Sequence, residues 1–209
     1  MSQAERARDE KETARIEAFS DGVFAIAITL LILEIKVPSE TSPAVGRALL
    51  AQWPWFFAFL TSFATIGIMW LNHHRLFGLI ARSNHLLQVL NGLLLLGVTF
   101  VPFPTAVVAQ CLGHSGERVA AGFYSATFVA IAITFNVLWR YASSPRRRPS
   151  LLSVSPNDPT VRAIHAQYRM GPLFYGLALA LAWWDARASV ALNLLLALYF
   201  AFPPRGGEG

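Results

Sequence analysis

Two polar clusters, each at one end of an apolar stretch, contain the side chains that could do chemistry. Ser20 and Asp21 lead into the run GVFAIAITLLILEI, and Asn72, His73 and His74 end a second run in the sequence WLNHHR. A carboxylate beside imidazoles can bind a metal ion or relay protons. Two histidine ligands on one helix face need a spacing of three or four residues, and these two are adjacent. A metal site is therefore not predicted.

The sequence also lacks the motifs of several enzyme classes. It contains no GxSxG, HExxH or GxxxxGK[ST] pattern, and its one cysteine, Cys111, excludes an internal disulfide and a CxxC site. We expect neither enzymatic activity nor a bound cofactor.

The composition instead indicates an integral membrane protein. Of 209 residues, 55% are hydrophobic and only 14% are charged, whereas soluble domains carry about 25% charged residues. A helix needs about 20 mostly apolar residues to cross a bilayer. We expect an all-α protein with six transmembrane helices, the fifth of which begins earlier than its apolar core, near Val161. The predicted spans are 16–37, 52–72, 86–109, 119–141, 170–184 and 188–202.

The distribution of Lys and Arg predicts the orientation in the membrane. With six spans, thirteen basic residues fall on the side of both termini and four on the other side. Because cytoplasmic segments are enriched in Lys and Arg, both termini are predicted to be cytoplasmic, and the net charge of +5 needs no nucleic-acid partner. The thirteen are Arg6, Arg8, Lys11, Arg15, Arg75, Arg82, Arg140, Arg146, Arg147, Arg148, Arg162, Arg169 and Arg205, and the four are Lys36, Arg47, Arg118 and Arg187.

A single domain is expected, because the connectors are too short to fold separately. Residues 1–15 are predicted to form a charged cytoplasmic leader, 16–203 the transmembrane domain and 204–209 a disordered tail. The longest connector, SSPRRRPSLLSVSPNDPT, reads as a cytoplasmic loop in which Arg146–Arg148 either contact anionic lipid headgroups or only determine the topology. The sequence PSETSP is predicted to form a short outer loop after the first helix.

The first span has two distinct faces when it is placed on a helix at 100° per residue. Ser20 and Asp21 point more than 100° away from Ile26. An apolar stripe at this spacing usually packs against another helix, and it can also line a pore. Thr29 borders the stripe. The residues of the stripe, within about 80° of one another, are Arg15, Phe19, Gly22, Ile26, Leu30 and Leu33.

The carboxylate of Asp21 needs a partner inside the protein. A charged side chain in a span costs about 2.5–3.5 kcal/mol on insertion scales and normally faces protein or water. The end of the second span lies on the same predicted side of the membrane. Trp70, Asn72 and either histidine could form a buried hydrogen-bonded cluster with Asp21. Alternatively, the histidines lie in interfacial water.

Two segments of the sequence resemble a known family. R-I-E-A-F-S-D, from Arg15 to Asp21, and the W-x-x-H-H pattern, from Trp70 to His74, are similar to the transmembrane protein 175 family, the lysosomal and endosomal potassium channels and their prokaryotic relatives. A single six-helix unit of this length resembles the bacterial form, which implies a homotetramer in a bacterial plasma membrane. The resemblance implies a passive cation channel that lacks a TVGYG filter and prefers potassium over sodium.

The resemblance also implies roles for individual residues. Ile26, Leu30 and Leu33 of each first helix would form the apolar rings of the pore, and Thr29 would form a layer that selects potassium over sodium. Arg15 would meet either the pore mouth or a carboxylate of a neighbouring subunit. A structural polar network would hold the pore helix to its neighbours, and its predicted members are Arg15, Phe19, Ser20, Asp21, Trp70, Asn72, His73 and His74.

Two alternatives to a potassium channel remain from the sequence. A proton-conducting channel or a secondary transporter would use Asp21, His73 and His74. A transporter favours broken helices in paired positions near the midplane. Pro102 and Pro104 are expected to kink the third span or end it early, and no matching pair occurs in another span.

Overall fold

The computed structural model describes residues 3–36, 45–146 and 149–202, and this part of the chain is all-helical, as predicted, apart from connecting loops and one isolated β-bridge. The predicted outer loop PSETSP, the predicted tail, Arg147, Arg148 and Arg205 lie outside the described residues. The elements are α1 (Gln3–Leu30), the 3₁₀ helix η1 (Leu31–Glu34), α2 (Val45–Ala51), α3 (Trp53–Phe77), α4 (His85–Phe100), α5 (Pro102–Cys111), α6 (Glu117–Ala142), α7 (Pro159–Arg169), α8 (Gly171–Leu181) and α9 (Ala186–Ala201).

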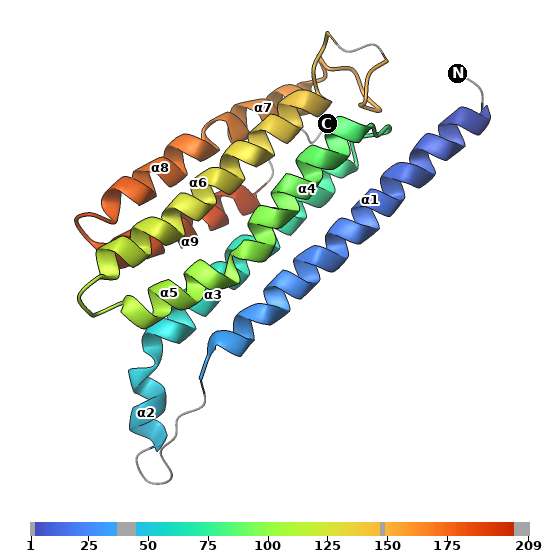
Figure 1. The fold of residues 1–209 in the computed structure, drawn as a ribbon. Coiled ribbons are helices and arrows are strands. Elements are labelled where there is room, and N and C mark those ends of the chain that lie inside the picture. Colours follow the sequence, from blue (N-terminus) through green and yellow to red (C-terminus); the bar gives the residue numbers. More distant parts are fainter. Residues whose placement is uncertain (1–2, 37–44, 147–148, 203–209) are drawn as a thin grey trace.

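The long helices form one elongated bundle, and α1 lies along its side (Figure 1). α1 packs on α3 and α4, whereas α6 packs on α4, α5, α8 and α9. α2 lies at one end of the bundle. The start of α1, the turn between α3 and α4 and the loop after α6 lie at the other end (Figure 1). The turn and the loop are joined there by an antiparallel β-bridge between Ile80 and Leu152.

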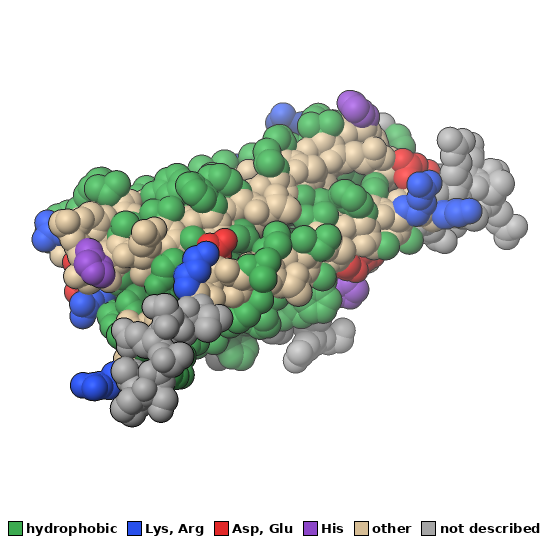
Figure 2. Space-filling model, turned by 60° about the horizontal axis from the view of Figure 1, so that its bottom comes forward, with side chains coloured by type: hydrophobic (Ala, Val, Ile, Leu, Met, Phe, Trp, Pro, Cys, Tyr) green, Lys and Arg blue, Asp and Glu red, His purple; other side chains and the backbone are tan. Residues whose placement is uncertain are grey.

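Four helical segments are long and apolar enough to cross a membrane, namely Lys11–Glu34, Trp53–Phe77, His85–Cys111 and Glu117–Ala142. They correspond to the first four predicted spans, although the first helix ends at Glu34, before the predicted residue 37. α8 has 11 residues and α9 has 16, so each is shorter than the about 20 residues of a typical span. Figure 2 shows apolar side chains along the length of one face, with charged side chains mostly toward its ends.

Proline residues interrupt two of the helical passes. Between α4 and α5, the carbonyl of Val101 accepts hydrogen bonds from the backbone N and the Oγ1 of Thr105, at 3.1 and 2.7 Å. Between α7 and α8, Pro172 has no N–H to donate to the carbonyl of Tyr168, and Asn136 Nδ2 donates to that oxygen instead, at 2.8 Å. The sequence predicts the first break. The second break, before Pro172, is not predicted from the sequence and is seen only in the structure. It explains why α8 is short.

Hydroxyl and amide groups join the helices of the bundle across its interior. Ser62 Oγ of α3 lies 2.7 Å from Thr105 Oγ1 of α5 and 2.9 Å from the hydroxyl of Tyr124 on α6. Asn193 Nδ2 of α9 donates to Ser125 Oγ of α6 at 2.9 Å. Lipid offers no competing donors or acceptors, so such bonds hold membrane helices in one arrangement. They make the bundle a defined support for α1.

Of the two glycines of α4, Gly97 is the one that packs closely against α6. A Cβ at this position would lie 2.8 Å from Cγ1 of Ile131, which is β-branched and has little freedom to move. Gly97→Ala is therefore expected to lower the free energy of unfolding by about 1–3 kcal/mol. Thermal unfolding in detergent would measure this loss.

Gly92 is the matched control on the same helix, because a Cβ there would meet nothing within 4 Å. Gly92→Ala should be neutral or stabilising by up to about 1 kcal/mol, since alanine favours the helix. Equal unfolding temperatures for the two variants would contradict the close packing of α4 on α6.

Candidate functional site

The inward face of α1 follows the helical repeat and packs on the bundle. Thr13, Ser20, Phe24, Ala27 and Leu31 are buried, at spacings of seven, four, three and four residues. These spacings place all five on one side of the helix. The apolar members fill the contact with α3 and α4, and Ser20 places a hydroxyl within it.

The opposite face of α1 is uncovered in the chain. Phe19 is 68% exposed, Ile26 58%, Leu30 40% and Leu33 68%, and a Cβ on Gly22 would meet nothing within 4 Å. These residues belong to the stripe predicted from the sequence, and Arg15 and Thr29 are exposed beside them. A row of large apolar side chains that this chain leaves uncovered must face lipid, further copies of the chain, or a pathway between copies.

The stripe ends in a change of helix type. α1 is α-helical to Leu30 and continues as the 3₁₀ helix η1 to Glu34. Residues three apart eclipse in a 3₁₀ helix, so Leu33 lies directly beyond Leu30. The 3₁₀ rise of about 2.0 Å per residue puts Ile26 and Leu33 about 12 Å apart along the axis, slightly more than a continuous α-helix would.

The hydroxyl hydrogen of Thr29 is used in a hydrogen bond within the helix. Its Oγ1 donates a hydrogen bond to the carbonyl of Ile26 at 2.9 Å. A hydroxyl oxygen has two acceptor lone pairs in addition to its donor. The exposed oxygen of Thr29 therefore faces outward as an acceptor, which is the polarity that a cation or its hydration water would contact.

A buried chain of three polar side chains ties α1 to α3 and α4. His73 Nε2 lies 2.9 Å from Asn91 Oδ1, and Asn91 Nδ2 donates to Ser20 Oγ at 2.9 Å. Ser20 Oγ in turn donates to the carbonyl of Ile16 at 2.8 Å. His73 also stacks on Phe77, with ring centroids 4.3 Å apart. The amide of Asn91 is the centre of this anchor because it serves both neighbours at once.

The remaining polar residues of the predicted network have separate partners. Trp70 Nε1 donates to Asp21 Oδ1 at 2.8 Å, and His74 Nδ1 lies 2.7 Å from Glu17 Oε1. Within the described residues, Asp21 forms no hydrogen bond or ion pair with either histidine. Asn72 turns away from α1: its amide donates to the carbonyl of Phe200 on α9, and its Oδ1 accepts from Arg75 and from the hydroxyl of Tyr168.

Phe19 and Arg15 lie on the exposed stripe and not within the anchor. Arg15 makes no ion pair with the residues that the structure describes. Its side chain is exposed beside the stripe.

Further polar contacts, which the sequence does not predict, hold the charged beginning of α1. Arg82 Nε lies 3.2 Å from Asp9 Oδ2, and Gln88 Nε2 donates to Glu12 Oε1 at 2.8 Å. Asp9 and Glu17 fall within about 80° of Ser20 on a helix. This spacing extends the inward polar face of α1 into the leader, so it is the feature of the sequence that could have predicted these contacts.

Within the described residues, no group of three or more His, Cys, Asp or Glu could hold a metal ion. An all-helical chain that has four membrane-length apolar helices is a multi-spanning membrane protein, and its first helix is anchored by polar side chains on one face and bare on the other.

Comparison with known proteins places this membrane protein in a family. The family profile described as "Endosomal/lysosomal potassium channel TMEM175" matches residues 15–102. The chain is 53% identical to a potassium channel of Chamaesiphon minutus, over 93% of this chain and 96% of that protein. It is 45% identical to a potassium channel of Streptomyces collinus, over 91% of this chain and 92% of that protein. The chain therefore belongs to the TMEM175 family, a family of ion channels and not of enzymes.

One solved structure and one animal relative extend the comparison. The crystal structure of a lysosomal potassium-selective channel TMEM175 homologue from Chamaesiphon minutus matches with a TM-score of 0.81 and 50% identity, over 94% of this chain and all of that one. A human protein named endosomal/lysosomal proton channel TMEM175 is 36% identical over 61% of this chain, but the match covers 27% of the human protein.

Proposed function

We propose that four copies of this chain form a potassium-permeable cation channel in a bacterial plasma membrane, with the four α1 helices around the pore. The observation that carries the proposal is the bare apolar stripe of α1, opposite a face held by the Ser20, Asn91 and His73 bonds. The bacterial relatives named as potassium channels, which match nearly their whole length, support the choice of ion. Each copy would contribute one stripe to the axis.

The pore would contain three apolar rings, from Ile26, Leu30 and Leu33. A hydrophobic constriction conducts while it is wide enough to stay wet and closes by dewetting when it narrows. Ile26 forms the ring on the cytoplasmic side, and Leu33 forms the outer ring, about 12 Å away. Potassium gives up hydration water more readily than sodium, so a narrow apolar neck favours potassium modestly.

The two shorter helical passes complete six transmembrane crossings in this proposal. α7 and α8 together span residues 159–181, and α9 follows after the Trp183–Trp184 pair. Tryptophans gather at membrane interfaces, and both are exposed, at 55% and 75%. An even number of crossings keeps both termini on the Arg-rich, cytoplasmic side. Residues 1–15 form the leader, and 16–203 form the transmembrane domain.

The structure offers little support for a secondary transporter. Its two helix breaks would have to pair near the midplane. The α4–α5 break is beside Phe123 of α6, whose ring contacts those of Phe100 and Phe103, and the α7–α8 break is beside Asn136 of α6. These α6 positions are 13 residues, or about 20 Å, apart along the helix. The breaks therefore lie at different depths.

A proton route is the second candidate, because the human relative is named a proton channel. The route through Asp21, His73 and His74 would need these groups to be connected. They have Trp70, Asn91 and Glu17 as their respective partners, so no continuous relay joins them among the described residues. Proton flux must still be measured beside potassium flux.

Purified protein in liposomes tests the proposal directly. Passive potassium efflux down its gradient is expected, with slower sodium flux and no requirement for a proton gradient. Empty liposomes and the same lipid with heat-unfolded protein are the controls. Folded tetramers that carry no potassium, or a dissociated monomer that carries all of it, would overturn the proposed channel.

Removal of the Thr29 hydroxyl should change ion preference more than total flux. Thr29→Ala deletes the exposed acceptor oxygen between the Ile26 and Leu33 rings, so the potassium-to-sodium ratio is expected to fall toward one. Thr29→Ser is the matched control, because it keeps the hydroxyl and should keep the ratio. Bi-ionic potential measurements give the ratio, and a Thr29→Ala ratio equal to that of the native protein would contradict a selective role for this layer.

A further inference from the structure

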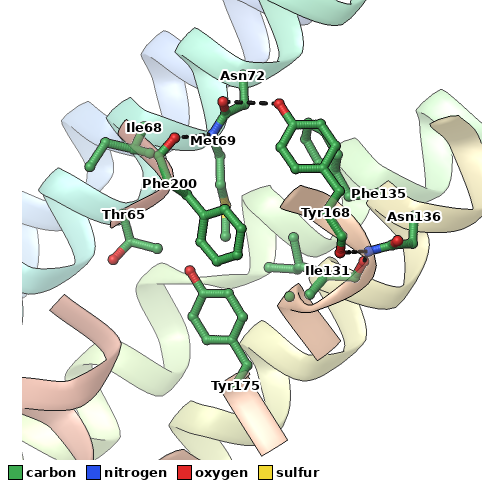
Figure 3. A pocket seen from close by; sticks show the side chains of 12 residues that line it. Thr65, Ile68, Met69, Asn72, Ile131, Phe135, Asn136, Tyr168, Tyr175 and Phe200 are labelled. Carbon is green, nitrogen blue, oxygen red and sulfur yellow. Dashed lines mark hydrogen bonds between the residues drawn. The ribbon is translucent and has the colours of Figure 1, made fainter. Parts of the chain in front are cut away.

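A partly open cavity of about 60 Å³ lies between α3, α6, α9 and the junction of α7 with α8 (Figure 3). Met69 and Asn72 contribute the α3 wall. Trp70 and His73, which contact α1 or its anchor, lie on another face of the same helix. The cavity is therefore separate from the stripe and from the polar anchor.

The walls of the cavity are mainly apolar and aromatic. Tyr175 and Phe200 are stacked, with centroids 6.2 Å apart and planes 14° from parallel. Phe135 and Tyr168 meet edge to face at 5.5 Å. No charged side chain is among the lining residues. An apolar cavity tends to stay dry and to accept small apolar molecules in place of water.

Most polar groups at the cavity already have protein partners. Asn72 is bonded to the carbonyl of Phe200 and to Tyr168, and Asn136 is bonded to the carbonyl of Tyr168 (Figure 3). These bonds hold the walls in place. The side-chain amides of the two asparagines are therefore already bonded to protein groups.

The hydroxyl of Tyr175 is the exception. The side chain is only 6% exposed, its hydroxyl points into the space between Phe200, Met69 and Thr65 in Figure 3, and it has no hydrogen-bond partner within the described chain. A ligand atom in the cavity can therefore form a hydrogen bond with this hydroxyl without displacing a protein partner. The cavity thus presents one polar contact in an aromatic surround.

We propose that this cavity binds a small neutral molecule with an aromatic body and one oxygen that hydrogen-bonds to Tyr175, taken up from the bilayer. The aromatic walls suit a ring, and the lack of charged lining residues disfavours ions. Phenol has this chemistry. Toluene has the same body without the oxygen, so the pair separates the ring from the hydrogen bond.

Thermal unfolding of the purified full chain, with and without each probe, tests the site. Phenol at ten times its Kd should raise the Tm of the native protein by about 3–6 °C. Ala132→Leu fills the cavity and should abolish the rise. Ala130→Leu, on the exposed side of α6, is the matched control and should keep it.

Tyr175→Phe removes only the hydroxyl and keeps the shape of the ring. It therefore tests the hydrogen bond even if Ala132→Leu, which fills the cavity, impairs folding. It should lose most of the phenol effect and retain the toluene effect. An equal phenol effect in the native protein, Ala132→Leu and Ala130→Leu would be an effect of phenol on the detergent and would overturn the site. An undiminished phenol effect in Tyr175→Phe would overturn the assigned hydrogen bond. This experiment measures binding alone, so its outcome is independent of the proposed conduction.

Discussion

Replacing Leu30 with alanine is expected to raise passive potassium flux through the reconstituted protein about tenfold. In the proposed pore, Leu30 of each subunit belongs to an apolar ring, and four shortened side chains widen the ring and keep it wet. A barrier lowered by about 1.4 kcal/mol corresponds to this factor in rate. Liposome flux at matched amounts of incorporated protein would measure it, with sodium flux rising at least in proportion.

Leu195→Ala is the control for loss of an exposed leucine. Leu195 is 61% exposed on α9, so its truncation removes a side chain of the same kind from an exposed surface outside the proposed pore. Its flux should stay within about twofold of the native protein, since surface changes of this type cost at most about 0.5 kcal/mol. Unchanged flux in both Leu30→Ala and Ile26→Ala would contradict a pore-lining role and would mean that the stripe only packs against another helix.

Replacing Asn91 with leucine is expected to lower the free energy of unfolding by about 2–3 kcal/mol. The substitution removes the bonds to His73 and Ser20, both of which are fully buried. His73 would then have neither ring nitrogen bonded, because Nδ1 already lacks a partner in the described chain. Hydrogen bonds between membrane helices are worth about 0.6 kcal/mol on average, but a buried group left unpaired costs about 1–3 kcal/mol. The second effect is the larger one here.

Gln88→Leu is the matched control for the Asn91 substitution. Gln88 also lies on α4 and bonds to α1, through Glu12, but this contact is exposed to water. Its loss is expected to cost no more than about 0.5 kcal/mol. Chemical unfolding in detergent compares the two variants, and equal losses would mean that burial does not set the strength of the α1 anchor.

Much of the helical framework follows from the sequence alone. Apolar runs of bilayer length predict the four long helices, and the 100° repeat of α1 predicts a polar face with Ser20 and an apolar face with Ile26 and Leu30. Both are local properties, because each depends only on which side chains occur at which spacing along one segment. The Pro102 pair predicts the break in its helix for the same reason.

The tertiary structure alone decided which polar groups meet. Asp21 pairs with Trp70 and not with a histidine, His73 bonds to Asn91 of α4, and His74 bonds to Glu17. These pairings depend on the rotation and depth of one helix against another. A shift of one residue along a helix turns a side chain by 100° and moves it about 1.5 Å, and the apolar pattern tolerates such shifts.

The break before Pro172 and the cavity beside it also depend on the packing of distant segments and not on the local sequence alone. The sequence contains the proline, but only the fold brings Asn136 of α6 to the carbonyl that the proline leaves unpaired. The cavity exists because rings from α6, α7, α8 and α9 meet there without filling the space. Local spacing determined which faces this protein must bury, whereas the packing of distant segments decided which partners and which void they form, because both depend on the relative placement of helices.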